Sequence, residues 1–266
     1  MSDRRNVYLF YHKDEKLVKK IQPLITLIEK EGFRLVEDPD HANIIVSIGG
    51  DGAFLQAIRK TNFRDDCLYS GVSIKNTINL YCDFHIEELD KIVEAMREEK
   101  VEVRRYPVLD VTIDKNIKFQ CLNECSIRSS IIKAFVMDVY IDDFHFETFR
   151  GDGMIVATPT GSTAYNKSVK GAVVDPLLPC FQVSEIASLN NNLYRTLGSS
   201  FILSTGRKLT LKIVQDGNDH PLIGMDNEAL SVKHIDEIEF SLSKKRIKTV
   251  KLKDNSFWAK VKRTFL

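Results

Sequence analysis

The first residues able to do chemistry lie in the stretch SIGGDGAFL at positions 47–55. Gly49, Gly50 and Gly52 separate an apolar run from a helical pattern, and helix N–H groups beside a loop without side chains can bind phosphate oxygens. Asp51 places a carboxylate there, which bound phosphates would repel unless a divalent cation neutralises it or it accepts a proton from a substrate. Both conditions indicate phosphoryl transfer, where a positioned base assists an attacking hydroxyl. A plain helix cap by Asp51 is the structural alternative.

This stretch matches neither of the two common phosphate-binding fingerprints. If Gly50 begins a G-x-G-x-x-G motif, Leu55 occupies the position of its third glycine. No Gly-Lys-Ser/Thr follows to complete a P-loop. The sequence therefore argues against an ordinary dinucleotide-binding fold and against a P-loop enzyme.

Three further polar clusters accompany the glycine-rich loop. In CLNECSIRSS (121–130), the amide of Asn123 beside the carboxylate of Glu124 suits vicinal ribose hydroxyls, or forms a polar turn. In FRGDGMIVATPTGSTAYNKS (149–168), polar residues flank one apolar strand and favour a nucleotide-sized pocket over a surface loop. They are Arg150, Asp152, Ser162, Thr163, Tyr165 and Ser168. The asparagines at 190–192 fit a helix C-terminus and a ligand contact equally well.

Residues 7 to 100 show the pattern of an α/β domain that positions the glycine-rich loop. Short apolar runs predict strands at 7–11, 44–48 and 67–74. Helical periodicity predicts helices at 15–32, 53–60 and 87–99. This alternation predicts a mostly parallel sheet with helices on its faces, in a domain of residues 1–100.

Residues 101–245 have the pattern of a mainly β domain. Apolar and polar residues alternate around 109–114, and short strands are expected at 118–122, 135–141, 145–149, 154–158, 208–214 and 238–242. We expect a tight junction near residue 101, with a cleft shared by the two domains. We expect residues 246–266 to pack back on the core as a C-terminal tail with solvated lysines, Lys260 among them. A basic amphipathic helix that binds a membrane or a partner is the alternative.

Composition restricts the partners and the compartment. The 38 basic and 37 acidic residues leave a net charge of +1, which gives no general attraction to nucleic acid or to an anionic membrane. The five scattered cysteines do not form a disulfide framework and fit the reducing cytoplasm. Cys121 and Cys125 lack a second Cys/His pair, so we expect no dedicated metal site.

Three motifs in this order resemble those of bacterial NAD kinases: GGDG at 49–52, NE at 123–124 and RGDGMIVATPTGSTAY at 150–165. GGDG alone also occurs in phosphofructokinases and in diacylglycerol or sphingoid-base kinases, but the three motifs in this order and spacing are highly specific. The resemblance spans nearly the whole chain. The resemblance implies an N-terminal α/β domain, a C-terminal β-sandwich-like domain and NAD in the cleft between them. It further implies ATP-dependent phosphorylation of the 2′-hydroxyl of the adenosine ribose of NAD, which gives NADP. Mg²⁺ or Mn²⁺ would come with ATP, without a dedicated protein cage, and the protein would be a homotetramer.

The same resemblance implies roles for particular residues. Asp51 would take the proton of the ribose hydroxyl, and the three glycines of the loop would hold phosphates through the backbone. Asn123 and Glu124 would meet the ribose and adenine. The dinucleotide pocket would be lined by Thr163, Ala164, Tyr165 and Ser168, with Arg150 and Ser162 in the same motif. Asp152 and the region of Ala187 would lie near the nicotinamide, partly across a subunit contact.

The chain departs from the family pattern at two places. Asn76 and Asn79 replace expected glycines in SIKNTINLYCD, which leaves Leu80 and Tyr81 as open candidates for ligand contact. Asp226-Asn227-Glu228 replaces the usual D-G-Q turn, so a contact by Asn227 is also open. Two other functions remain: a lipid or sugar kinase of the wider GGDG group, and a non-catalytic NAD-binding sensor.

Overall fold

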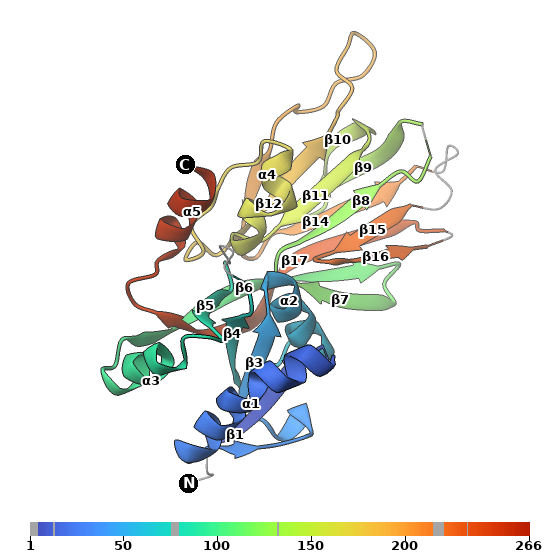
Figure 1. Cartoon of the computed structure of the whole chain (residues 1–266). Helices are drawn as coiled ribbons and strands as arrows, with labels where there is room; N and C mark the ends of the chain where they lie inside the picture. The colour runs from blue at the N-terminus through green and yellow to red at the C-terminus, as the bar shows by residue number, and fades with distance from the viewer. Residues whose placement is uncertain (1–4, 13, 76–79, 132, 215–220, 233) are drawn as a thin grey trace. The chain divides into compact units, whose positions relative to one another are not determined.

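Two long strands carry the chain from one structural unit to the other. The computed structural model describes residues 5–12, 14–75, 80–131, 133–214, 221–232 and 234–266. One unit consists of residues 1–105 and 247–266, and the other of residues 106–246. The boundary falls within β6 (Val101–Ile113) and within β17 (Glu237–Leu252), both traced in Figure 1. The C-terminal residues therefore belong to the same unit as the N-terminal ones.

The first unit is built on a parallel sheet. Its strands are β1 (Asn6–Tyr11), β2 (Arg34–Leu35), β3 (Ile44–Gly49), β4 (Leu68–Ser73) and β5 (Cys82–His85). They follow the order β2-β1-β3-β4, and β5 also pairs with β4. The end of β17 pairs in parallel with β4, where Thr249 lies opposite Tyr69. This sheet places the carboxyl end of β3, and with it the glycine-rich loop, next to the carboxyl end of β4.

Helices cover both faces of this sheet. On one face, α1 (Glu15–Lys30) and α3 (Leu89–Arg97) pack with Val46 and Val72 into one apolar core. On the other, Phe54 of α2 (Asp51–Lys60) meets Tyr69 of β4 edge to face at 6.2 Å between ring centroids. Because Tyr69 and Val72 are three residues apart on one strand, they point to opposite faces. Among the described residues of the unit, the other helices are the short η1 (Pro39–His41) and the C-terminal α5 (Phe257–Phe265).

The second unit is mainly β and holds two antiparallel sheets. One has the order β10-β9-β14-β17, with β6 paired to β17 and to β7; the other has the order β13-β12-β11-β8-β15-β16. The strands of the first sheet include β7 (Ile117–Cys121), β9 (Phe135–Ile141), β10 (Phe144–Gly151) and β14 (Lys208–Ile213). Those of the second are β8 (Glu124–Arg128), β11 (Gly153–Ala157), β12 (Cys180–Ile186), β13 (Phe201–Ser204), β15 (Leu222–Met225) and β16 (Glu228–Ser231).

The inner faces of these two sheets form one apolar core. Met137, Leu211 and Phe240 from the first sheet pack in the same cluster as Val156 and Phe181 from the second. A face-to-face pair of antiparallel sheets is a β-sandwich. The expected architecture, an α/β part followed by a mainly β, sandwich-like part, is confirmed.

The structure also contains strands that the alternation of residues does not indicate. β8 and β12 carry polar residues, yet most of each strand is buried, so no period-two pattern marks them. The short η2 (Thr160–Thr163) and α4 (Tyr165–Ser168) follow β11. At the C-terminal end, β17 continues to Leu252 before α5 begins, whereas the sequence had suggested a tail from residue 246 onward.

Candidate active site

The glycine-rich loop makes a tight passage from β3 into α2. Gly49 is the last residue of β3, Gly50 is the N-cap of α2, and Asp51 is the first helical residue. A Cβ atom on Gly49 would lie 2.6 Å from the Cβ of Ala53, so a side chain at this position would clash with the first helical turn. The absence of side chains leaves the N-terminus of α2 open to an anion.

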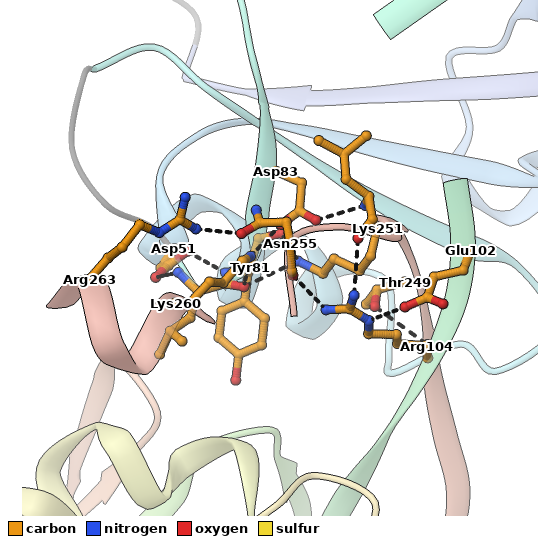
Figure 2. Close-up of polar contacts among 12 residues, drawn as sticks. Asp51, Tyr81, Asp83, Glu102, Arg104, Thr249, Lys251, Asn255, Lys260 and Arg263 are labelled. Atoms are coloured by element: carbon orange, nitrogen blue, oxygen red, sulfur yellow. Dashed lines mark hydrogen bonds and ion pairs between the residues drawn. The ribbon is translucent and has the colours of Figure 1, made fainter. Parts of the chain in front are cut away.

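The carboxylate of Asp51 bonds to a distant backbone segment and does not act as a helix cap. The N–H of Leu80 donates to Oδ2 at 2.7 Å, and the N–H of Tyr81 donates to Oδ1 at 2.8 Å (Figure 2). The N-cap position of α2 is occupied by Gly50, so the helix has no side-chain cap. Each carboxylate oxygen has a second lone-pair direction. The side chain of Asp51 is thus fixed in orientation while keeping capacity to accept a proton.

Residues 80–83 are held in turn by two lysines from the C-terminal segment. Lys260 of α5 donates through Nζ to the carbonyl of Leu80 at 2.6 Å, and Lys251 of β17 donates to the carbonyls of Leu80, at 3.2 Å, and of Tyr81. Both ammonium groups also contact Oδ1 of Asp83 (Figure 2). Burial alone would raise the pKa of Asp83, but the two lysines and its hydrogen bonds more than offset this and hold that pKa below its usual value.

The expectation of a solvated Lys260 is therefore wrong. The residue is only 1% exposed, because its stem packs inside the unit while its ammonium reaches Asp83 and Leu80. Lys262, two residues further along α5, is exposed. The charge pattern of the tail did not separate these two lysines, since burial depends on the partners that the fold supplies.

In the second unit, Asn123 and Glu124 form a turn between β7 and β8 that Asp226 organises. The carboxylate of Asp226 accepts the N–H groups of Leu122 at 3.1 Å, of Asn123 at 2.7 Å and of Glu124 at 3.2 Å. The N–H of Thr158 donates to the carbonyl of Asn123 at 2.8 Å. This ring of bonds ties the turn to the end of β11 and to the loop between β15 and β16.

The loop after β11 packs directly on this turn. A Cβ atom added at Gly161 would lie 2.0 Å from the carbonyl oxygen of Asn123, so only glycine fits there. The hydroxyls of Thr158 and Thr160 both donate to the carbonyl of Leu122. The structure therefore brings two of the sequence motifs, NE and TPTGST, into contact within one unit.

Glu124 is a buried carboxyl group with an unusual environment. It is 6% exposed, and among the described residues its Oε2 has no hydrogen-bond partner. Burial, reinforced by the nearby charge of Asp226, raises the pKa of Glu124 to about 8, although the backbone of Tyr165 opposes the shift. At neutral pH the group is therefore mainly protonated, and it can donate as well as accept a hydrogen bond.

The other candidates in 150–168 differ in what their side chains do. The hydroxyl of Ser162 is fully buried; it donates to the carbonyl of Pro159 at 2.6 Å and accepts the N–H of Val174 at 2.9 Å. Thr163 is buried and donates to the carbonyl of Thr160 at 3.3 Å. Ala164 and Tyr165 are half-buried, and Ser168 is exposed at the end of α4. Solvent thus reaches Ala164, Tyr165 and Ser168 more readily than Ser162.

Arg150, Asp152 and Ala187 gather at a second place, around the connection from β10 to β11. The N–H of Asp152 donates to the carbonyl of Ile186 at 2.9 Å, next to Ala187, whose φ of 46° is in the left-handed region. The guanidinium of Arg150 lies over the ring of Tyr194 at 4.2 Å. Asp152 and Ala187 are exposed.

The segment that departs from the family pattern is only partly described. Asn76 and Asn79 lie outside the described residues, whereas Leu80 and Tyr81 are described and contact Asp51 through their backbone. Asn190, Asn191 and Asn192 are in the irregular loop between β12 and β13, not at the end of a helix. In that loop Asn191 accepts the N–H groups of Leu193 at 2.8 Å and of Tyr194 at 2.9 Å.

Sequence reasoning did not identify four residues that support these clusters: Asp83, Asp226, Lys251 and Lys260. For Asp226 a signal existed, because an Asp in a turn between two short strands can collect backbone N–H groups. Asp83 and the two lysines carry no such signal. Asp83 lies 168 positions before Lys251 and 177 positions before Lys260. The strands of Asp83 and Lys251 come together because β4 pairs with both β5 and β17.

The described residues contain no group of three or more His, Cys, Asp or Glu side chains that could hold a metal ion. Cys121 and Cys125 are buried thiols on β7 and β8. No helix in the described parts of the chain is long and apolar enough to cross a membrane.

The chain therefore combines a parallel α/β unit that carries a glycine-aspartate loop with a β-sandwich unit that carries an Asn-Glu turn. This set of features suits a kinase that binds a nucleotide. Residues 122–252 match the family model described as the ATP-NAD kinase C-terminal domain. The chain is 68% identical to NAD kinase 2 of Bacillus licheniformis over 266 residues, 100% of both chains. It is 67% identical to NAD kinase 2 of Bacillus subtilis over 263 residues, 99% of this chain and 98% of that one. The chain belongs to the NAD kinase family.

Solved structures share the fold. Yeast NADH kinase complexed with NADH superposes with a TM-score of 0.78 at 20% identity, over 98% of this chain and 87% of that chain. An NAD kinase from Archaeoglobus fulgidus in complex with ATP gives a TM-score of 0.73 at 24% identity, over 97% and 98% of the two chains. At these identities the likeness concerns the fold alone.

Proposed function

We propose that this protein transfers the γ-phosphoryl group of ATP to the 2′-hydroxyl of the adenosine ribose of NAD, and that Asp51 is the general base. The ribose oxygen forms the new bond to phosphorus, the bond from that phosphorus to the β,γ-bridging oxygen breaks, and ADP leaves. The proton of the hydroxyl passes to the Asp51 carboxylate. The products are NADP and ADP.

The observation that carries the proposal is the setting of Asp51. Its carboxylate is half-buried at the N-terminus of α2 and is oriented by two backbone N–H groups. A base fixed in one direction meets a hydroxyl in productive geometry at little entropic cost. The neighbouring glycines expose N–H groups that favour phosphate. Family membership supports the reaction, since the relatives of 60–68% identity are named NAD kinase 2.

For the sugar and the base of NAD, we assign the turn at 123–124. An amide beside a mainly protonated carboxyl offers both donors and acceptors, which suit ribose hydroxyls and the edge of adenine. Thr163, Ala164, Tyr165 and Ser168 would line the dinucleotide pocket next to this turn. For the nicotinamide end we assign the group around Arg150, Asp152 and Ala187.

A divalent cation is expected to enter with ATP. Mg²⁺ is usually bound by substrate phosphates and waters with one or two carboxylates, and the described residues offer no larger ligand cluster. Bound in this way, it would neutralise charge on the transferring phosphoryl group.

We also propose that the protein is a homotetramer in the cytoplasm. All five cysteines are buried free thiols, as suits a reducing compartment. Sedimentation at assay concentration tests the assembly, and a strict monomer would contradict it.

One incubation tests the proposed reaction and its alternatives. Purified protein is mixed with NAD, ATP and Mg²⁺, and NADP is measured with an NADP-specific dehydrogenase. Appearance of NADP with equimolar ADP is the expected result. Binding of NAD without turnover would instead indicate a sensor, and phosphorylation of a lipid or sugar with no NADP would indicate a kinase of the wider GGDG group.

A further inference from the structure

A buried cluster of charge lies directly behind Asp51, and the proposed reaction does not yet use it. Asp83, Lys251 and Lys260 have side chains exposed by no more than 2%. Lys251 comes from β17, Lys260 from α5 and Asp83 from β5, so three elements converge on one point (Figure 2). Together with Asp51 they make two positive and two negative groups, which balance in charge.

The peptide group between Leu80 and Tyr81 connects this cluster to Asp51. Its carbonyl oxygen, on Leu80, accepts Nζ of Lys260 at 2.6 Å and Nζ of Lys251 at 3.2 Å. Its N–H, on Tyr81, donates to Oδ1 of Asp51 at 2.8 Å. A cation on the carbonyl polarises the peptide and strengthens the bond that its N–H donates. One peptide plane therefore transmits the position of two ammonium groups to the carboxylate.

Burying two lysines is not an efficient way to stabilise a fold. Taking ammonium groups out of water costs several kcal/mol per ion, and apolar residues of the same volume often serve stability as well or better. The apolar setting here is already good, because the ring of Tyr81 stacks on that of Phe54 with centroids 4.9 Å apart. Two buried cations on one peptide segment are better explained by orientation than by stability.

We propose that Lys251 and Lys260, held together by Asp83, are positioning residues that fix the Leu80–Tyr81 peptide and thereby aim the Asp51 carboxylate at the hydroxyl it deprotonates. In this proposal the C-terminal helix α5 acts through Lys260 and does not itself contact the substrate. The inference rests on the proposed role of Asp51 as base, and it adds that the base depends on the last residues of the chain for its orientation.

The test replaces one ammonium by a neutral group of similar length. Lys260→Met is compared with Lys262→Met, which changes an exposed lysine of the same helix. We expect Lys260→Met to lower kcat by about 10- to 100-fold with the KM for NAD within about threefold, because a small misplacement of a reacting group costs rate more than binding. Lys262→Met should leave both constants unchanged.

The pH profile gives a readout that a purely structural role would not move. Lys260→Met removes one positive charge from the peptide that orients the base, so the pH profile of kcat/KM should change in this variant and stay unchanged in Lys262→Met. The titratable groups that face this site are Asp83, Lys251, Lys260 and Cys82. The pKa of the Cys82 thiol is raised to about 12, mainly by burial, so it does not titrate in this range.

Combination with Asp51→Asn separates the two proposals. If Lys260 acts through Asp51, adding Lys260→Met to Asp51→Asn causes no further loss of rate. A full 10- to 100-fold loss in that background, or an unchanged kcat and pH profile in the single variant, overturns the positioning role while leaving the proposed function intact. Failure of the proposed function itself is seen separately, as absence of NADP formation by the wild type.

A thermal melt shows whether Lys260→Met is folded, and a second variant tests the proposal if it is not. If Lys260→Met does not fold, Lys251→Met carries the same prediction, since its ammonium also donates to the carbonyl of Leu80. Lys260→Arg keeps the positive charge and should retain more of kcat than Lys260→Met. Equal rates for the arginine and methionine variants would contradict a role for the charge.

Discussion

At the scale of single residues, the two candidate carboxyl groups, one in each unit, are held in opposite ways. Asp51 accepts two backbone N–H groups and is half-buried. Glu124 is buried, with one oxygen unpartnered among the described residues and the pKa raised to about 8. Environments that separate two carboxyl groups in this way assign them different tasks. Asp51 suits proton acceptance, and Glu124 suits hydrogen bonding to a neutral ligand group.

Glu124→Gln should change how stability depends on pH. The pKa of Glu124 is about 8 when folded, against its ordinary 4.5, so the folded state binds the proton more tightly. This stabilisation is complete below pH 4.5 and is lost as pH rises through about 8. The melting temperature of wild type relative to Glu124→Gln should therefore be lower at pH 9 than at pH 6. An equal difference at the two pH values would contradict the shift.

At the scale of elements, the turn between β7 and β8 depends on the loop that follows β11. A methyl group at Gly161 would lie 2.0 Å from the Asn123 carbonyl oxygen, so Gly161→Ala must push the two segments apart. We expect a loss of about 1–3 kcal/mol in the free energy of unfolding. The KM for NAD should rise as well, since Asn123 and Glu124 move. A denaturant melt and steady-state kinetics measure both, and an unchanged KM would argue against the assignment of this turn.

The connection between β17 and α5 is held by Arg104. Its guanidinium donates to the carbonyls of Asn255 at 2.9 Å and of Leu252 at 3.0 Å (Figure 2). Arg104→Met removes these bonds to half-buried carbonyls and should lower Tm by about 1–5 °C, given about 0.5–1.5 kcal/mol for a lost hydrogen bond. Limited proteolysis should then cut near α5 sooner than in Arg105→Met, the exposed neighbour. Equal cleavage in the two variants would show that Arg104 does not secure the helix.

At the scale of the whole molecule, the sequence predicted the architecture because it depends on local patterns. Alternating strand and helix signals at 7–100 and the period-two pattern around Leu109 and Val111 are local, and both units follow from them. The supports of the site are not local. Asp83 contacts Lys251 and Lys260, which lie far from it in the sequence. A lysine is buried or exposed according to the partners that the folded chain places around it, and the local sequence does not show these partners.

The buried thiols give a prediction for the intact chain. All five cysteines of the chain are buried, and burial raises the pKa of Cys67, Cys82 and Cys180. A thiol reagent added to native protein near neutral pH should therefore react slowly, and guanidinium chloride should release all five groups. Fast stoichiometric reaction of any thiol in the native protein would contradict this burial.

The most direct measurement of the central claim is the rate of NADP formation by Asp51→Asn, with Asp65→Asn as the matched control because Asp65 is an exposed aspartate of the same unit. The amide can keep one bond to the Leu80–Tyr81 backbone but cannot take the proton. The expected result is a loss of about 10²–10⁴-fold in kcat with NAD binding retained, and no loss in the control. Near-normal NADP formation by Asp51→Asn would contradict the role of Asp51 as the base.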